Sequence, residues 1–117
     1  MSGLESKSFD SADEVRTPDK TTVEVVRLNG ATAGRFTFQP GWKWSECVKP
    51  KVGTDTCQAH HVGAVVSGTI HVAMEDGDSL DLGPGDAYVI PPGHDAWNTG
   101  DVPVVMYEFE SAEGYAT

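Results

Sequence analysis

A cysteine and two histidines have the types and spacing of a metal site. Cys57 and His61 are four residues apart, so in an extended strand both side chains lie on one face. The neighbouring His60 then lies on the opposite face unless a bulge intervenes. His94 follows a rigid Pro-Pro-Gly corner and can approach the pair from an opposite wall. A thiolate and two imidazoles favour zinc or copper over iron or manganese.

The same residues admit other roles. Glu46 shares its strand parity with two tryptophans, and it could supply a carboxylate ligand if that face points inward. A histidine can be hydrogen-bonded inside a core without any metal, and free cysteine is a common small buried residue. Cys47 and Cys57 could pair, although a reducing compartment favours free thiols or metal ligands. The spacing leaves open whether His60 or Glu46 replaces one ligand.

Short apolar runs separated by turn residues must position these side chains. Thirteen Gly and seven Pro fall mainly between the runs, and no segment combines helical spacing of apolar residues with caps at both ends. The pattern predicts eight or more strands in an all-β sandwich or barrel. The main runs cover residues 23–26, 36–38, 63–66, 70–74, 80–82, 87–90 and 104–109.

The length of the chain suits a single domain. Its 117 residues are near the commonest domain size, and two domains would leave neither with a workable core. Residues 1–20 are rich in Ser, Asp, Glu and Lys and have no helical or strand periodicity over a useful length. We therefore predict an N-terminal arm over residues 1–20 and a β-barrel domain over residues 21–117.

The charge of the chain limits its partners. Eighteen acidic and eight basic residues give a net charge of −10, which repels nucleic acid and anionic membrane surfaces. Residues 1–13 lack the continuous apolar core of a signal peptide, and nowhere is there a span of 18 apolar residues. We expect a cytoplasmic protein that binds neither nucleic acid nor membrane.

The segment from Gly85 to Gly93 resembles the second sequence motif of the cupin superfamily. That motif reads Gly, five residues, Pro, any residue, Gly, two residues and His, and the match is complete as far as Gly93. Ala96 then occupies the position of the motif histidine, and His94 stands two residues before it. The glycines and prolines of the motif are therefore present, but the ligand position is changed.

The first cupin motif is matched less completely. Gly68 fits its last glycine, and counting back from it places His61 at the position of the motif glutamate. Cys57 and Asp55 then fall on the positions of the two motif histidines. The resemblance extends over roughly residues 41–110. The chain is also similar to a group of small stand-alone cupins of undefined activity.

This resemblance implies a cupin double-stranded β-helix, a jelly-roll barrel, and a homodimer. Cupin barrels bind transition metals in dioxygenases, isomerases, epimerases and decarboxylases, while others are binding or sensor modules. We predict a small metal-binding cupin that binds or transforms a small organic molecule in its barrel. Its predicted ligands for a divalent transition metal are Cys57, His61 and His94, with a vacant coordination position. Trp44 and Trp97 are the predicted pocket residues.

Two other functions agree with the same sequence. A non-catalytic module that binds or senses a metabolite explains the departures from the cupin ligands at Asp55, Cys57, His61 and Ala96. A metal-free isomerase or epimerase would use His61 as the base and a tyrosine as the acid. Bound metal argues against the metal-free enzyme, and turnover argues against the binding module.

Overall fold

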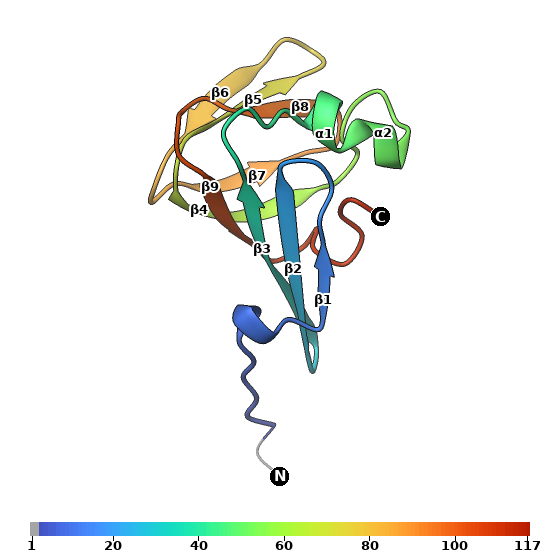
Figure 1. Cartoon of the computed structure of the whole chain (residues 1–117), viewed down its shortest axis with the longest axis vertical. Coiled ribbons are helices and arrows are strands. Elements are labelled where there is room, and N and C mark those ends of the chain that lie inside the picture. Colours follow the sequence, from blue (N-terminus) through green and yellow to red (C-terminus); the bar gives the residue numbers. More distant parts are fainter. Residues whose placement is uncertain (1–2) are drawn as a thin grey trace.

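The computed structural model describes residues 3–117 and consists mainly of two antiparallel β-sheets (Figure 1). The larger sheet has the strand order β1-β2-β3-β9-β4-β7, and the smaller has the order β6-β5-β8. The predicted all-β class is confirmed. The strands are β1 (Glu14–Arg16), β2 (Thr21–Leu28), β3 (Ala31–Phe38), β4 (His61–Ser67), β5 (Ile70–Met74), β6 (Ser79–Leu82), β7 (Ala87–Ile90), β8 (His94–Asn98) and β9 (Val104–Glu108).

Tight glycine turns set the register of the hairpins. β2 and β3 pair along their whole length, from Thr21 opposite Phe38 to Leu28 opposite Ala31, across a turn at Asn29-Gly30. Gly30 has a φ of 81°, a backbone conformation that side chains with a Cβ rarely adopt. Gly77, with a φ of 100°, serves the same purpose between β5 and β6.

The core lies between the inner faces of the two sheets. Alternate residues of each strand point inward, as the period of a β-strand requires, so that Ile70 and Val72 of β5 are buried. His71 lies on the outer face of the same strand, where its Nδ1 is 2.8 Å from Asp81 Oδ1. The large side chains of the core include Phe36, Phe38, Trp42, Trp44, Ile90, Met106 and Tyr115.

Isolated backbone bridges join β8 of the smaller sheet to the segment between β3 and β4. One pairs Lys43 with Trp97, and the other pairs Cys57 with His94. In the second bridge, the Cys57 amide donates to the His94 carbonyl over 2.8 Å, and the Gly93 amide donates to the Cys57 carbonyl over 2.8 Å. This bridge fixes the backbones of two predicted metal ligands beside each other.

Two short helices lie in a segment that was predicted to contain none. α1 (Trp44–Cys47) and α2 (Lys49–Val52) follow each other directly, and each has four residues. A helix of one turn is too short to leave a periodic pattern of apolar residues in the sequence. Among the described residues, no helix has the length and apolarity needed to cross a membrane.

Part of the predicted N-terminal arm joins the larger sheet. A short 3-10 helix (Phe9–Ser11) places the Phe9 ring 5.4 Å from the ring of Tyr107, centroid to centroid. β1 then pairs with β2 and forms the edge of the sheet. Residues 1 and 2 of the arm lie outside the described residues, and the boundary between arm and barrel at residue 20 stays a prediction.

The segment after β9 folds back beside β1 (Figure 1), and one buried arginine binds its backbone there. The buried guanidinium of Arg16 donates to the carbonyls of Ala112, Glu113 and Tyr115 over 2.7–2.8 Å. A side chain of β1 thereby fixes residues 112–115, whose backbone has no strand partner. We call residues 109–117 the C-terminal segment.

Replacing this arginine should loosen the C-terminal segment. Arg16→Leu is expected to lower the free energy of unfolding by about 2–4 kcal/mol, because three carbonyls lose a charged donor. Urea denaturation followed by tryptophan fluorescence measures this change. Arg27→Leu is the control, since Arg27 makes exposed ion pairs with Glu14 and Glu113 and should cost less than about 1 kcal/mol. Equal losses in the two variants would contradict the role assigned to Arg16.

Candidate metal centre

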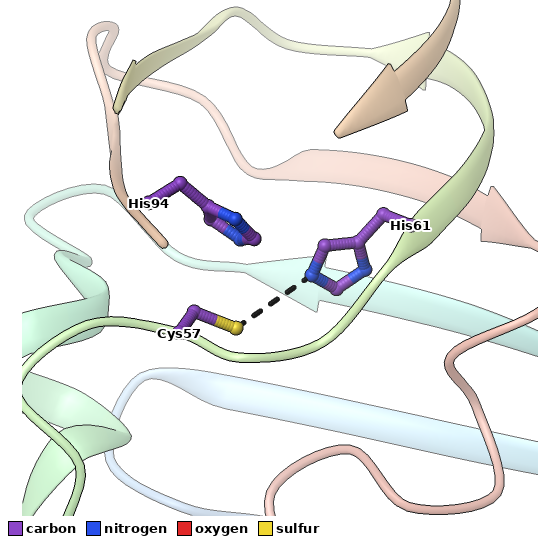
Figure 2. A group of neighbouring side chains, drawn as sticks. All are labelled: Cys57, His61 and His94. Atoms are coloured by element: carbon purple, nitrogen blue, oxygen red, sulfur yellow. Dashed lines mark hydrogen bonds between the residues drawn. The ribbon is translucent and has the colours of Figure 1, made fainter. Parts of the chain in front are cut away.

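The structure brings Cys57, His61 and His94 together (Figure 2). One potential ligand atom of each residue lies within 4.8 Å of the others, and all three residues are buried. Cys57 precedes β4, His61 is the first residue of β4, and His94 is the first residue of β8. Figure 2 shows the thiol and both imidazoles pointing toward one another. The cluster therefore draws on both sheets.

Hydrogen bonds orient both imidazoles. His61 Nδ1 lies 2.7 Å from Glu108 Oε1 and 2.9 Å from Ser111 Oγ, while its Nε2 faces Cys57 Sγ at 3.8 Å. His94 Nδ1 lies 2.7 Å from the Pro91 carbonyl, which can only accept, so Nδ1 carries the proton. In each ring Nδ1–H donates to the protein, and Nε2 is the nitrogen left to bind a ligand. Metal-binding histidines in proteins are commonly held in this way.

Glu108 is a functional residue that the sequence analysis missed. Its side chain is 0% exposed, and its carboxylate also accepts hydrogen bonds from the hydroxyls of Tyr88 and Ser111. The signal was present in the sequence, because Glu108 has the same parity as Val104 and Met106, which point into the core. A glutamate at a core position of an apolar strand needs partners there.

The cluster favours the thiolate of Cys57. Burial alone raises the pKa of this thiol, but its interactions with His61 and His94 outweigh burial and lower the pKa to about 6. Burial lowers the pKa of His61, but its hydrogen bonds to Cys57 and Glu108 outweigh it and raise the pKa to about 9. Both pKa shifts therefore favour a thiolate and an imidazolium over the neutral pair. A cation bound at Nε2 would replace the proton of that imidazolium.

The donor set fits a transition-metal ion. One thiolate and two imidazoles are ligands that such ions accept, and three protein ligands leave a coordination position for water or substrate. Glu108 would act on the ion through His61 and not as a ligand, because its carboxylate oxygens already accept hydrogen bonds from His61, Tyr88 and Ser111. A carboxylate that accepts the Nδ1–H of a metal-binding imidazole makes that imidazole a more basic ligand.

The alternative ligands lie away from the cluster. Glu46 is exposed on α1, so its expected strand parity with the tryptophans is wrong, because the chain turns into a helix at Trp44. His60 points outward, as the alternation predicted, and its Nδ1–H donates to Glu110 over 2.6 Å. Asp55, at a motif histidine position, has a fully exposed side chain. Both cysteines of the chain are free thiols in the structure.

The two predicted pocket tryptophans lie in different places. Trp44 is buried and lines two cavities next to the cluster. Trp97 lies on the outer face of the smaller sheet, where its ring packs 4.7 Å from the His71 ring and Lys43 Nζ lies 5.1 Å above it. The alternation of β8 explains the difference, since His94 and its inward neighbours take the other face. The pocket role expected for Trp97 does not fit this position.

Two cavities of very different size adjoin the cluster. The inner cavity, about 20 Å³ between the sheets, is lined by His61, His94 and Trp42 among others. The indole Nε1 of Trp42 is the one buried side-chain polar atom in residues 3–117 without a hydrogen-bond partner. The outer pocket, about 500 Å³, is lined by Cys57. The imidazoles thus face the inner cavity, and the thiol faces the outer pocket.

A family model identifies the family of the chain, and solved structures share its fold. The family model described as Cupin domain matches residues 34–110. No curated protein sequence matches the chain. A protein of unknown function from Rhizobium leguminosarum bv. viciae 3841 has a similar structure, with a TM-score of 0.63 and 21% identity over 92% of this chain and 96% of its own.

Two further structures that resemble this one belong to named proteins. KdgF from Halomonas sp. aligns with a TM-score of 0.57 and 24% identity, over 84% of this chain and 87% of its own. The formate complex of oxalate decarboxylase from Lactobacillus farciminis aligns with a TM-score of 0.61 and 18% identity, over 87% of this chain. The chain spans only 32% of that decarboxylase chain. At these identities the likeness extends to the fold alone.

The buried carboxylate should be a strong contributor to stability. Glu108→Ala is expected to lower the free energy of unfolding by about 3–5 kcal/mol, because it leaves His61 and Tyr88 without their buried partner. Chemical denaturation of the metal-free protein measures this change. The control is Glu110→Ala, which removes an exposed carboxylate two residues away and should cost less than about 1 kcal/mol. A small loss for Glu108→Ala would contradict the assigned network.

Proposed function

Because the chain belongs to the cupin family, we propose that it binds a transition-metal ion and binds or transforms a small organic molecule beside that ion. The observation that carries this proposal is the buried cluster of Cys57, His61 and His94. In this cluster both Nδ1 atoms are already occupied by protein acceptors, and both imidazoles act on the thiol of Cys57. Such pre-oriented donors suit a metal ion better than they suit a packed core.

The donor set favours zinc or copper over iron or manganese. Ferrous oxygenases typically use two histidines and one carboxylate as ligands. Among the described residues, the carboxylate that contacts the cluster is that of Glu108. Its oxygens already accept hydrogen bonds from His61, Tyr88 and Ser111. A soft sulfur ligand with two imidazoles is the set that zinc and copper accept most readily.

The residues of the chain would prepare the site for chemistry. A zinc or copper ion with an open position polarises a carbonyl or lowers the pKa of a bound water. Glu108 holds the Nδ1–H of His61, and the Pro91 carbonyl holds that of His94, so the ligands need no reorientation when the ion binds. The Tyr115 ring packs edge-on against the His61 ring, with the two centroids 5.4 Å apart.

The structurally similar proteins support the proposal of a small organic ligand. One of them is an oxalate decarboxylase in complex with formate, which is a small organic acid. The outer pocket beside Cys57, at about 500 Å³, has the volume typical of small-molecule sites. The net charge of −10 disfavours nucleic acid and anionic membranes as partners. The homodimer and the cytoplasmic location stay predictions.

A metal-free enzyme is the second candidate, and one observation favours it. Cys57, His61 and Glu108 form a line of hydrogen bonds, which resembles the order of nucleophile, base and orienting acid in covalent catalysis. His61 would then move protons, and Tyr115 is the tyrosine in ring contact with it. A non-catalytic metabolite-binding module is the third candidate, and it would use the same outer pocket.

The metal content of the purified protein tests these functions first. Protein purified without added metal or chelator is expected to hold near-stoichiometric zinc or copper, and His61→Ala is expected to lose it, because one of three ligands is removed. Elemental analysis by mass spectrometry measures both. His71→Ala is the matched control, since His71 lies on the outer face of β5 and should leave the content unchanged. A parent protein without metal would favour the metal-free enzyme or the binding module.

The carboxylate behind His61 should tune the affinity of the site. Glu108→Gln keeps the volume of the side chain but removes its charge, so metal affinity should fall by roughly 10- to 100-fold. Competition with a chromophoric chelator at fixed pH measures the affinity. Tyr88→Phe serves as the control, because it removes one hydrogen bond to Glu108 but leaves its charge. Unchanged affinity in Glu108→Gln would show that Glu108 does not act on the ion through His61.

A further inference from the structure

We infer that the outer pocket is the binding site of the organic ligand and that it selects an uncharged molecule carrying hydroxyl or N–H donors over a carboxylate. This inference rests on the proposed function, because the ligand is placed beside the proposed metal ion. Neither the family nor the structural relatives imply such a selection, and one relative is named for an acid that it decarboxylates.

The size of the two cavities decides where an organic molecule can bind. The inner cavity of about 20 Å³ has room for about one water molecule. The outer pocket of about 500 Å³ lies within the usual range for small-molecule sites. Cys57 belongs both to the ligand cluster and to the wall of the outer pocket. A molecule in the outer pocket therefore lies next to the proposed ion.

The charges around the outer pocket disfavour a carboxylate. The residues that line it include no lysine or arginine, so within residues 3–117 its one basic side chain is that of His60. His60 Nδ1–H donates to Glu110 over 2.6 Å, so an anion finds no unpaired positive charge on the wall.

The hydrogen-bonding groups of the wall also select against a carboxylate. Thr54 Oγ1 donates to the Thr56 carbonyl over 2.7 Å, and Gln58 Nε2 donates to Thr56 Oγ1 over 2.8 Å. Ser111 Oγ donates to Glu108. Gln58 Nε2 also donates to the Thr56 carbonyl over 3.4 Å, so the donors of these three side chains are committed. The Gln58 carbonyl oxygen and the hydroxyl lone pairs remain to accept. A carboxylate can only accept, whereas hydroxyl, amide and amine groups donate.

Aromatic and apolar side chains form much of the rest of the wall. Trp44 and Tyr115, which also line the inner cavity, add an indole N–H and a hydroxyl, and Val48, Val52, Ala59 and Ala116 are apolar. An apolar body with one or two donor groups therefore matches the pocket. Small aromatic or aliphatic amides, alcohols and phenols have this composition.

Matched pairs of probes test the selection. The probes are small carboxylates and their corresponding primary amides and alcohols, such as benzoate, benzamide and benzyl alcohol. Ligand-observed NMR and calorimetry would measure binding to the full chain, both zinc-loaded and metal-free. The uncharged members are expected to bind at least about tenfold more tightly than the acids, since charge and donors both favour them. Equal or tighter binding of the acids, or no binding by any probe, would overturn the inference.

Two variants locate the binding. Ala59→Phe fills the pocket and is expected to abolish amide binding while the metal content stays that of the parent. Thr54→Lys places a cation at an exposed position of the same wall, so it should raise carboxylate affinity by about tenfold even if Ala59→Phe fails to fold. Amide binding that survives in a folded Ala59→Phe, or carboxylate affinity that is unchanged in Thr54→Lys, would place the ligand elsewhere.

A charge-matched pair tests the role of Glu110. Glu110→Gln releases His60 from its carboxylate, so the preference for amides over acids should fall by about tenfold. Asp101→Asn changes the net charge equally at an exposed position outside the pocket wall and should leave the preference unchanged. Equal changes in both variants would overturn the assignment to the pocket.

These measurements separate the inference from the proposed function. If amides bind to the parent protein without metal, and Ala59→Phe abolishes that binding, the pocket is supported and the metal site is rejected. A metal-loaded protein that prefers carboxylates would support the metal site and overturn the selection.

Discussion

The buried charge of Glu108 is the constraint on which the rest of the structure depends. A carboxylate without access to solvent must be matched by donors, and those come from His61 on β4, Tyr88 on β7 and Ser111 in the C-terminal segment. β9, which carries Glu108, lies between β3 and β4 in the larger sheet. One side chain therefore ties together neighbouring strands, the C-terminal segment and the imidazole of the candidate site.

The geometry of the candidate site follows from this network and from one backbone bridge. Glu108 decides which nitrogen of His61 faces inward, and the pairing of Cys57 with His94 brings the other two side chains to it from across the sheets. The bridge joins the start of β8 to the segment before β4, so the ligands come from parts of the chain that are far apart in sequence. The cluster is thus a product of sheet packing rather than of a local loop.

The strands and most of the candidate site could be predicted from the sequence because alternation and turn residues determine them. Cys57 and His61 have the same parity, and the Pro-Pro-Gly corner aims His94 at them. α1 and α2 could not be predicted, since four residues leave no helical period, and the wrong parity of Glu46 followed from that. Trp97 was predicted to be a pocket residue, although β8 turns His94 and Ala96 inward instead. Glu108 could have been found by its parity, but its partners lie on other strands.

The contact of Arg16 with the C-terminal segment has a consequence for the folding pathway. Its hydrogen bonds join residues 96 to 99 positions apart, so they close a loop that contains most of the chain. The entropy of closing such a loop is lost before the contact is gained, which makes contacts of this kind late events in folding. We therefore expect the part of the outer pocket wall that belongs to the C-terminal segment, which includes Ser111 and Tyr115, to assemble late.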